Sequence, residues 1–337
     1  MARTTFRNVI TTPDKISDIN PQNQKLVDGF LKVKGIQSSL GTIFGYHSDL
    51  NIFFVYVLEH FQNKFFVDIR KVEVAEFFSF CSSELQWGSN RFNRMRGCLS
   101  SLSDYIERYL DDDYPLFHNY IIKTIDSMPE NLRREKTILT ELQISQLLQW
   151  LKDTNRKQEA CLAALAVSCG ARASELARFT TDLIDFNNLV YSDVFIETTK
   201  PIKTKGKTRN GNLKYQYIIK AIFESPYREW IEERQQILSR RGLFHDFIFI
   251  QADGSPATVY TLRAWMKNWG EFLGVPVYPH AFRHYAVTFL TRIGLPSELI
   301  CELMGWKSSE MFKIYNDLTG KDRKWKELDI LKKYLEE

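Results

Sequence analysis

The apolar residues of this 337-residue chain recur at helical spacing, and that pattern is interrupted between residues 127 and 139. The interrupting stretch, SMPENLRREKTIL, contains Pro129 and then concentrates charge, as an exposed connection between domains does. A chain of this length exceeds the usual size of one domain, and each part is long enough to bury its own core. The sequence therefore predicts two domains, at 23–126 and 140–337, joined by a linker at 127–139.

The first domain is expected to be all helical. Residues 1–22 are polar and contain Pro13 and Pro21, which favours an extended arm over a helix. Beyond this arm, apolar residues recur at helical spacing in five segments, of which the second has the strongest pattern. These segments lie near 22–34, 40–60, 71–83, 90–110 and 115–127.

The second domain begins with a helix signal. In TELQ, Thr140 and Gln143 form the pattern of a capping box ahead of an apolar helix. A second apolar helix, CLAALAVSCG, is expected to end at Gly170, and a short helix is expected to begin near Ser174.

A β-rich region follows, and helical patterns then return. The runs 182–199 and 212–223 have strand composition, and Asn210-Gly211 between them favours a type I′ hairpin turn. From Ser225 onward the pattern is mainly helical, apart from a short run at 247–251. The expected fold class is therefore mainly α with a small antiparallel β-sheet.

The charge distribution is compatible with a polyanionic partner. The formal net charge is only +4, but residues 200–220 contain seven basic side chains and no acidic one. Such a patch suits phosphates, although a solubilising hairpin would have the same composition. The basic residues are Lys200, Lys203, Lys205, Lys207, Arg209, Lys214 and Lys220.

Cysteine usage and hydropathy bear on the compartment. The five cysteines are odd in number, widely spread and without a CxxC pair, which argues against a disulfide framework or a structural zinc site. The first residues lack the apolar core of a signal peptide, and the longest apolar run, at 52–58, is too short to cross a bilayer. We expect a cytoplasmic protein with no membrane partner, associated with the nucleoid if it binds DNA.

Tyr315 is the candidate nucleophile, and the residues of the motifs that precede it indicate this role. A phenol with a pKa near 10 needs nearby positive charge or a base to react at neutral pH. In HAFRH, Pro279 marks a helix start, so His280 and Arg283 share one helical face and could pair an acid/base with a phosphate-binding guanidinium. A zinc site of the HExxH type is disfavoured, because Ala281 stands where the essential glutamate would be.

Two further motifs complete the candidate site. Arg172 follows the helix-ending Gly170, and Glu175 is close enough to orient it. Near the C-terminus two short helices are expected around Gly305, with Trp306 at the junction. The indole could donate to a phosphate oxygen or wall the pocket, and the helix pair could equally be a helix-turn-helix DNA reader.

In their order and spacing these elements resemble the tyrosine recombinase (phage integrase) family. The resemblance rests on GARASEL at 170–176, the basic hairpin, HAFRH at 280–284, and a Gly-Trp pair with Tyr315 nine residues after Trp306. It extends over about 145 residues of the second domain. The helical first domain and the charged linker are similar to the family's core-binding domain and its connection, though they carry no comparable motif.

The resemblance implies roles for individual residues. Arg172 and Arg283 would clamp the scissile phosphate, His280 would act as acid/base, and Trp306 would stand where many members have histidine. Tyr315 would form a 3′-phosphotyrosine while releasing a 5′-hydroxyl, with no metal, ATP or other cofactor. A hairpin lysine would protonate that leaving oxygen. Lys203 and Lys205 are both candidates, and Lys205, next to Gly206, is preferred.

The resemblance also implies a way of working on DNA. The expected function is site-specific recombination, by a C-shaped two-domain clamp on duplex DNA that works as a homotetramer on two duplexes. Accessory DNA-bending proteins are compatible with this function. The amphipathic segment 321–337 would dock on a neighbouring protomer or pack on its own domain.

Two alternatives stay open. A type IB topoisomerase shares the chemistry but relaxes DNA without pairing sites, and a helix-turn-helix protein would bind DNA without cleaving it. The sequence does not decide the DNA site, the biological role among integration, transposition and resolution, or whether cleavage occurs in cis or in trans.

Overall fold

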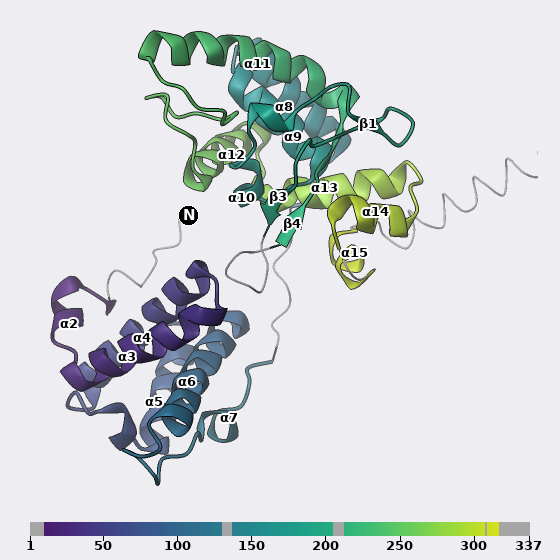
Figure 1. Cartoon of the computed structure of the whole chain (residues 1–337). Coiled ribbons are helices and arrows are strands. Elements are labelled where there is room, and N and C mark those ends of the chain that lie inside the picture. Colours follow the sequence, from purple (N-terminus) through teal and green to yellow (C-terminus); the bar gives the residue numbers. More distant parts are fainter. Residues whose placement is uncertain (1–9, 130–136, 205–211, 307–308, 317–337) are drawn as a thin grey trace, which may run out of the picture. The chain divides into compact units, whose positions relative to one another are not determined.

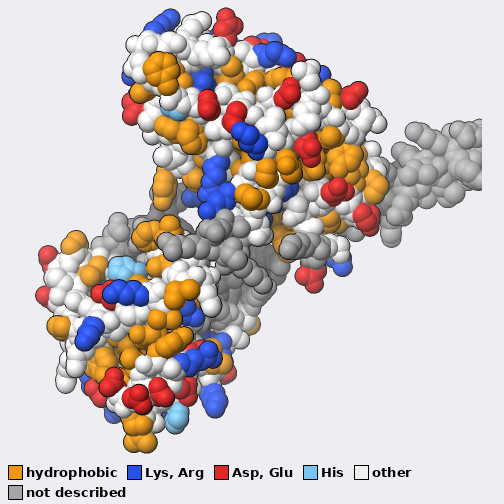
Figure 2. All heavy atoms as spheres, viewed as in Figure 1, with side chains coloured by type: hydrophobic (Ala, Val, Ile, Leu, Met, Phe, Trp, Pro, Cys, Tyr) orange, Lys and Arg blue, Asp and Glu red, His pale blue; other side chains and the backbone are white. Residues whose placement is uncertain are grey.

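The structure is a computed structural model that describes residues 10–129, 137–204, 212–306 and 309–316 (Figure 1). Residues 10–129 form one compact unit, and the later described residues form a second. The predicted linker lies largely at 130–136, outside the described residues, so the linker stays a prediction. Charged side chains of both signs are interspersed over the visible face of each unit (Figure 2).

The first unit is a bundle of helices around an aromatic core. Helix α3 packs against α4, and α6 packs against α3, α4 and α5. Edge-to-face contacts such as that of Phe53 with Phe77, whose ring centroids are 5.0 Å apart, fill its centre. Its elements are α2 (Pro13–Ser17), α3 (Pro21–Gln37), α4 (Leu40–His60), the 3₁₀ turn η1 (Phe66–Asp68), α5 (Lys71–Ser83), α6 (Ser89–Tyr109) and α7 (Ile121–Thr124).

The prediction of an extended arm at 1–22 is wrong over its described part. Pro13 and Pro21 each occupy the first turn of a helix, where the missing backbone N–H removes no hydrogen bond. Thr12 and Asn20 cap these two helices with their side chains. The prolines therefore start helices here instead of preventing them.

The prediction of a helix over 115–127 is correct only for α7. The residues ahead of α7 form a loop held by Asn119, whose side-chain amide donates to the Ser100 carbonyl at 3.1 Å and to Asp104 Oδ1 at 2.7 Å. Its Oδ1 accepts the Ile121 N–H at 3.1 Å. These side-chain bonds replace the helical ones. The helices predicted near 22–34, 40–60, 71–83 and 90–110 are confirmed, with ends shifted by a few residues.

The second unit is built around α9. Residues 160–169 of this helix are all buried, as expected of a helix that is apolar on every side. Helices α8, α11 and α13 and strand β5 pack around it. The helices of this unit are α8 (Glu141–Asp153), α9 (Lys157–Cys169), α10 (Ala173–Leu176), α11 (Lys220–Arg241), α12 (Val259–Leu273), α13 (Pro279–Arg292), α14 (Ser297–Met304) and α15 (Ser309–Tyr315), with the 3₁₀ turn η2 (Thr181–Leu183).

Two helix boundaries follow the predicted signals. Thr140 Oγ1 accepts the Gln143 N–H at 3.2 Å, and Gln143 Oε1 accepts the Thr140 N–H at 2.9 Å, which is the predicted capping box. Helix α9 ends at Gly170, which has φ +55°, in the left-handed region.

The strands are short and antiparallel. Strands β1 (Leu189–Val190), β2 (Phe195–Glu197) and β5 (Tyr217–Ile219) form one sheet in the order β1-β2-β5. Strands β3 (Ile202–Thr204) and β4 (Asn212–Lys214) form a separate pair, with Ile202 opposite Lys214. The described chain is thus mainly helical with a small antiparallel sheet, which confirms the fold class.

One detail of the β-rich region differs from the prediction, and another lies outside the described residues. The run 212–223 ends as strand at Ile219, because α11 begins at Lys220. The predicted turn at Asn210-Gly211 lies outside the described residues.

Candidate active site

Arg172 is fixed at the start of α10 by its own backbone and by Glu175. As the N-cap residue it is extended, with φ −72° and ψ 155°, directly after the left-handed turn at Gly170. The Glu175 carboxylate accepts the Arg172 N–H at 3.0 Å and Nη1 at 2.9 Å. Because Glu175 is only 1% exposed, this ion pair is held rigidly while part of the guanidinium faces solvent.

Arg283 lies in the interior of the second unit, where two helix ends hold it. Its Nη1 donates to the Gly170 carbonyl at 2.8 Å, and its Nη2 donates to the Met304 carbonyl at 3.3 Å. The last carbonyls of a helix have no intrahelical donor and carry partial negative charge, so they suit a buried cation. Burial, and then the charge of Arg172, lower the pKa of Arg283.

His280 lies one turn before Arg283 on α13 and is exposed. Although the residue as a whole is exposed, the protein partly desolvates its imidazole, and this desolvation, followed by the positive charges of Arg283 and Arg172, lowers the pKa of His280. The neutral imidazole therefore dominates at neutral pH, and it can accept a proton as well as donate a hydrogen bond.

Tyr315 ends α15 and lies among the other candidate residues. It is 8% exposed. Its ring centroid is 4.6 Å from that of His284, 5.2 Å from that of Trp306 and 6.4 Å from that of His280. The central carbon of the Arg283 guanidinium lies 5.3 Å from the same ring. His280, Arg283, Trp306 and Tyr315 therefore lie close together, and the charge of Arg172 acts on His280 and Arg283.

Trp306 stacks on Tyr315 with an interplanar angle of 24°, and the Arg283 guanidinium carbon is 5.0 Å from its ring. Within the described residues the buried indole Nε1 has no acceptor. A buried donor without an acceptor is unfavourable, so an oxygen of a ligand that reached this nitrogen would satisfy it.

The hairpin lysines are only partly placed by the structure. Lys205 lies outside the described residues. The Lys203 side chain is exposed on β3, and its carbonyl accepts Arg178 Nη1 at 2.7 Å.

Sequence reasoning did not single out Lys214, which reaches into this site from β4. Burial, and then the charge of Arg283, lower the pKa of Lys214 to about 7. The sequence placed Lys214 only within the basic patch at 200–220, because its inward direction depends on pairing with Ile202 and on the close approach to Gly305, which no local pattern encodes.

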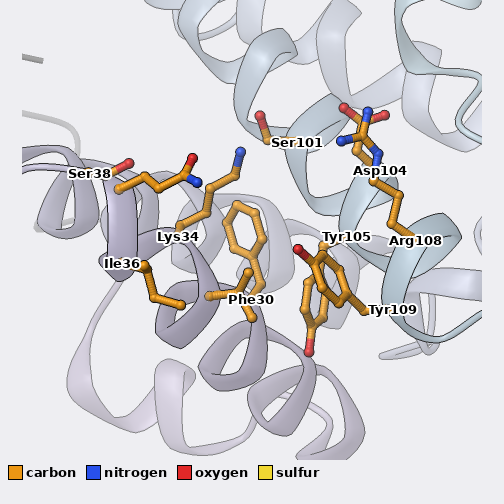
Figure 3. A pocket seen from close by; sticks show the side chains of 11 residues that line it. Phe30, Lys34, Ile36, Ser38, Ser101, Asp104, Tyr105, Arg108 and Tyr109 are labelled. Carbon is orange, nitrogen blue, oxygen red and sulfur yellow. The ribbon is translucent and has the colours of Figure 1, made fainter. Parts of the chain in front are cut away.

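Other features of the described residues do not belong to this site. A hollow of about 400 Å³ on the first unit is lined from α3 and α6, with Phe30, Lys34, Tyr105 and Arg108 around it (Figure 3). Among the described residues no group of three His, Cys, Asp or Glu side chains is placed to hold a metal ion. No helix in the described part is long and apolar enough to span a membrane.

Comparison with known proteins matches both units. A model of the phage integrase family matches residues 137–321, more than half of the chain. The SPbeta prophage-derived recombinase-like protein YomM of Bacillus subtilis strain 168 is 23% identical over 288 residues, which cover 82% of this chain and 80% of YomM. The tyrosine recombinase XerC of Oceanobacillus iheyensis is 24% identical over 311 residues, which cover 88% of this chain and 93% of XerC.

Solved structures show the same fold. The Tn1549 transposon integrase in complex with transposon right end DNA aligns with a TM-score of 0.63 at 16% identity, over 91% of this chain and 98% of that one. XerH bound to palindromic difH substrate aligns with a TM-score of 0.60 at 19% identity, over 84% and 78% of the two chains.

The fold and the family match together define a tyrosine-type site-specific recombinase. The chain belongs to the phage integrase family.

Proposed function

We propose that this recombinase cleaves and rejoins duplex DNA through a covalent bond between Tyr315 and the 3′-phosphate of the broken strand. The phenolic oxygen attacks phosphorus, the bond from phosphorus to the 5′-oxygen breaks, and a 5′-hydroxyl is released. Attack by a 5′-hydroxyl from a second duplex then releases the tyrosine and completes strand exchange. The phosphodiester energy is retained in the intermediate, so no ATP is consumed.

The observation that carries this proposal is the convergence of two fixed guanidinium groups on one tyrosine and one histidine. Arg172 and Arg283 are anchored from behind, by Glu175 and by helix-end carbonyls. Preorganised cations of this kind stabilise the charge that develops on a pentacoordinate phosphorus. These cations stabilise the charge that metal ions stabilise in other phosphoryl-transfer enzymes, so the proposed reaction needs no metal.

The remaining residues have matching roles in the proposal. Neutral His280 takes the phenol proton and hydrogen-bonds the phosphate, and Trp306 Nε1 donates to a phosphate oxygen. A lysine of the β3-β4 hairpin, with Lys205 preferred over Lys203, protonates the leaving 5′-oxygen.

We extend the proposal to the assembly. Residues 23–126 would form the core-binding domain and 140–337 the catalytic domain, which together clamp duplex DNA. Exchange between two sites needs four protomers on two duplexes, and the segment 321–337 would be exchanged between protomers. Phage or transposon mobility is the favoured setting, because relatives named for a prophage and a transposon share this family or fold. The protein would work on DNA in the cytoplasm.

The test is covalent capture from a library. Wild-type protein is incubated in EDTA with duplexes that carry a randomised core and a nick, so that the cleaved end diffuses away and rejoining is blocked. Denaturation keeps only covalently bound DNA, which is sequenced to give the site. We expect one enriched sequence, and recombination of a plasmid that carries two copies of it.

Other outcomes contradict the proposal in distinguishable ways. Plasmid relaxation by monomers with no enriched sequence would indicate topoisomerase activity. Tight binding with no covalent product would indicate a DNA-binding protein without catalysis. Adducts that require a divalent ion would contradict the metal-free mechanism.

A further inference from the structure

In the second unit, the carbonyl ends of two helices bind two cationic side chains. Helix α9 ends at Gly170 and α14 ends at Gly305, both with left-handed φ. The carbonyls of Gly170 and Met304 hold Arg283. The adjacent carbonyl of α14, that of Leu303, accepts the Lys214 ammonium at 2.8 Å. Neighbouring carbonyls at one helix end therefore bind Arg283 and Lys214 side by side.

The path of the Lys214 side chain is built into the fold. Lys214 ends β4 opposite Ile202, whose side chain is buried, so the lysine points inward. Its stem crosses Gly305 so closely that a Cβ on that glycine would stand 2.5 Å from Lys214 Cδ and 2.7 Å from Cε. Gly305 thus serves both the turn, at φ +65°, and the passage of the lysine.

The charges around Lys214 are predominantly positive. Arg283 and Arg172 lower the pKa of Lys214, whereas the Glu175 carboxylate and the Cys169 thiol raise it. Burial and Arg283 disfavour its charged form, as the lowered pKa shows. A lysine in such surroundings is unfavourable for stability, and a bound phosphate would supply the missing negative charge.

We propose that Lys214 is a positioning residue of the phosphate site: it fixes the carbonyl end of α14 that holds Arg283 and ties that end to the hairpin strand β4. This inference rests on the proposed function. It gives Lys214 a role distinct from proton donation to the leaving oxygen, which belongs to Lys203 or Lys205. Since the tie joins the hairpin to the arginine, it couples two parts of the site that must act together.

The first test is single-turnover cleavage of the captured DNA site by Lys214→Met. We expect a loss of about 10- to 100-fold, the range for a reactive group displaced by roughly 1 Å. The matched control is Lys267→Met, since Lys267 is 80% exposed on α12 of the same unit, and its rate should equal that of wild type. A 5′-bridging phosphorothiolate, whose sulfur leaves without a proton, should not rescue Lys214→Met.

The second test separates positioning from a purely structural role. Removing an unfavourable buried charge should leave Tm unchanged or raise it by roughly 2–4 °C, the shift for about 1 kcal/mol in a domain of this size. The unfolded lysine has a pKa of 10.5 and the folded one about 7. Any gain of Lys214→Met over wild type is therefore largest below pH 7 and shrinks as pH rises toward 10.5.

A second variant changes the glycine in the contact between Lys214 and Gly305. Gly305→Ala should slow cleavage, because its methyl group displaces the lysine stem. In a Lys214→Ala background the same change should add a smaller loss, limited to the backbone strain at φ +65°, because the side chain that it displaces is gone.

The outcomes are distinguishable from failure of the proposed function. If wild type forms no adduct, the proposed function fails. If wild type cleaves, three results for Lys214→Met show that the positioning role is wrong. The first is cleavage as fast as that of wild type, and the second is rescue of its cleavage by the phosphorothiolate. The third result is a loss of activity together with a Tm drop of several degrees. Additive losses from Gly305→Ala and Lys214→Ala would also overturn it.

Discussion

The guanidinium of Arg283 lies over the ring of Tyr315, with 5.3 Å between its central carbon and the ring centroid. The same guanidinium lies 5.0 Å from the Trp306 ring and donates to two helix-end carbonyls. The cation that would bind phosphate is therefore also the group that orders the aromatic residues around the candidate nucleophile. Changes at Arg283 should affect both phosphate binding and the position of the tyrosine.

Arg283→Lys should lower the rate of covalent adduct formation by about 100-fold or more, the loss typical of one preorganised donor. A lysine ammonium cannot span two carbonyls and stack on two rings as the planar guanidinium does. The measurement is single-turnover cleavage of the captured site. Arg292→Lys, on the same helix but exposed and paired with Glu141, should stay within about twofold of wild type. Equal losses in the two variants would contradict the assignment.

Glu175→Gln should reduce cleavage by roughly tenfold without weakening DNA binding to the same extent, because it loosens the orientation of Arg172. The amide keeps the shape of the carboxylate but loses its charge. Cleavage and gel-shift binding of the captured site are compared, with Glu271→Gln, an exposed position on α12, as the control. An unchanged cleavage rate would show that Arg172 does not need this partner.

Gly170→Ala should destabilise the second unit more than Gly274→Ala. Both glycines have positive φ, at +55° and +67°, so both variants carry a backbone penalty of about 1 kcal/mol. A Cβ at Gly170 would also meet Ala286 Cβ at 3.1 Å, whereas nothing lies within 4 Å at Gly274. We expect an additional loss of roughly 1–2 kcal/mol at Gly170. Urea denaturation of the two variants measures the difference, and equal losses would contradict the close contact.

Glu73 should make the stability of the first unit depend on acid pH. Burial raises the pKa of this carboxyl, but hydrogen bonds from Lys64 and Arg70 outweigh burial and lower the pKa from 4.5 to about 2. Its stabilisation is present above pH 4.5 and is lost as pH falls toward 2, and after screening at the exposed Arg70 it amounts to about 2–3 kcal/mol.

Hydrogen exchange of α5 peptides checks this pH dependence. Glu73→Gln should exchange faster than wild type at pH 7, with a difference in opening free energy that shrinks as pH is lowered toward 2. The exposed Glu76→Gln on the same helix should match wild type at every pH. A difference between Glu73→Gln and wild type that does not depend on pH would contradict the assigned pKa.

Local signals predicted much of the fold. Gly170 as a helix end, Thr140 as a cap and the start of α13 at Pro279 follow from rules that involve only neighbouring residues. The same local rules failed for the N-terminal prolines and for the loop before α7. At Asn119 the deciding bonds go to Ser100 and Asp104, far away in sequence.

The candidate site was predictable as a set of residues but not as a geometry. Spacing and order brought Arg172, His280, Arg283, Trp306 and Tyr315 together as a hypothesis. Lys214 was not predicted as part of the site, because the inward direction of its side chain depends on pairing with β3 and on the passage over Gly305. Neither the pairing nor the passage is encoded within a few residues of Lys214.

The measurement that tests the account most directly is mass spectrometry of the DNA-linked peptide formed on the captured site. Trypsin should release IYNDLTGK, in which Tyr315 is the single tyrosine, with the 3′-phosphate of the cleaved strand on its phenolic oxygen. We predict this product for wild type and for Tyr285→Phe, and none for Tyr315→Phe. A DNA linkage on any other residue, or undiminished adduct from Tyr315→Phe, would contradict the assignment of Tyr315 as the nucleophile.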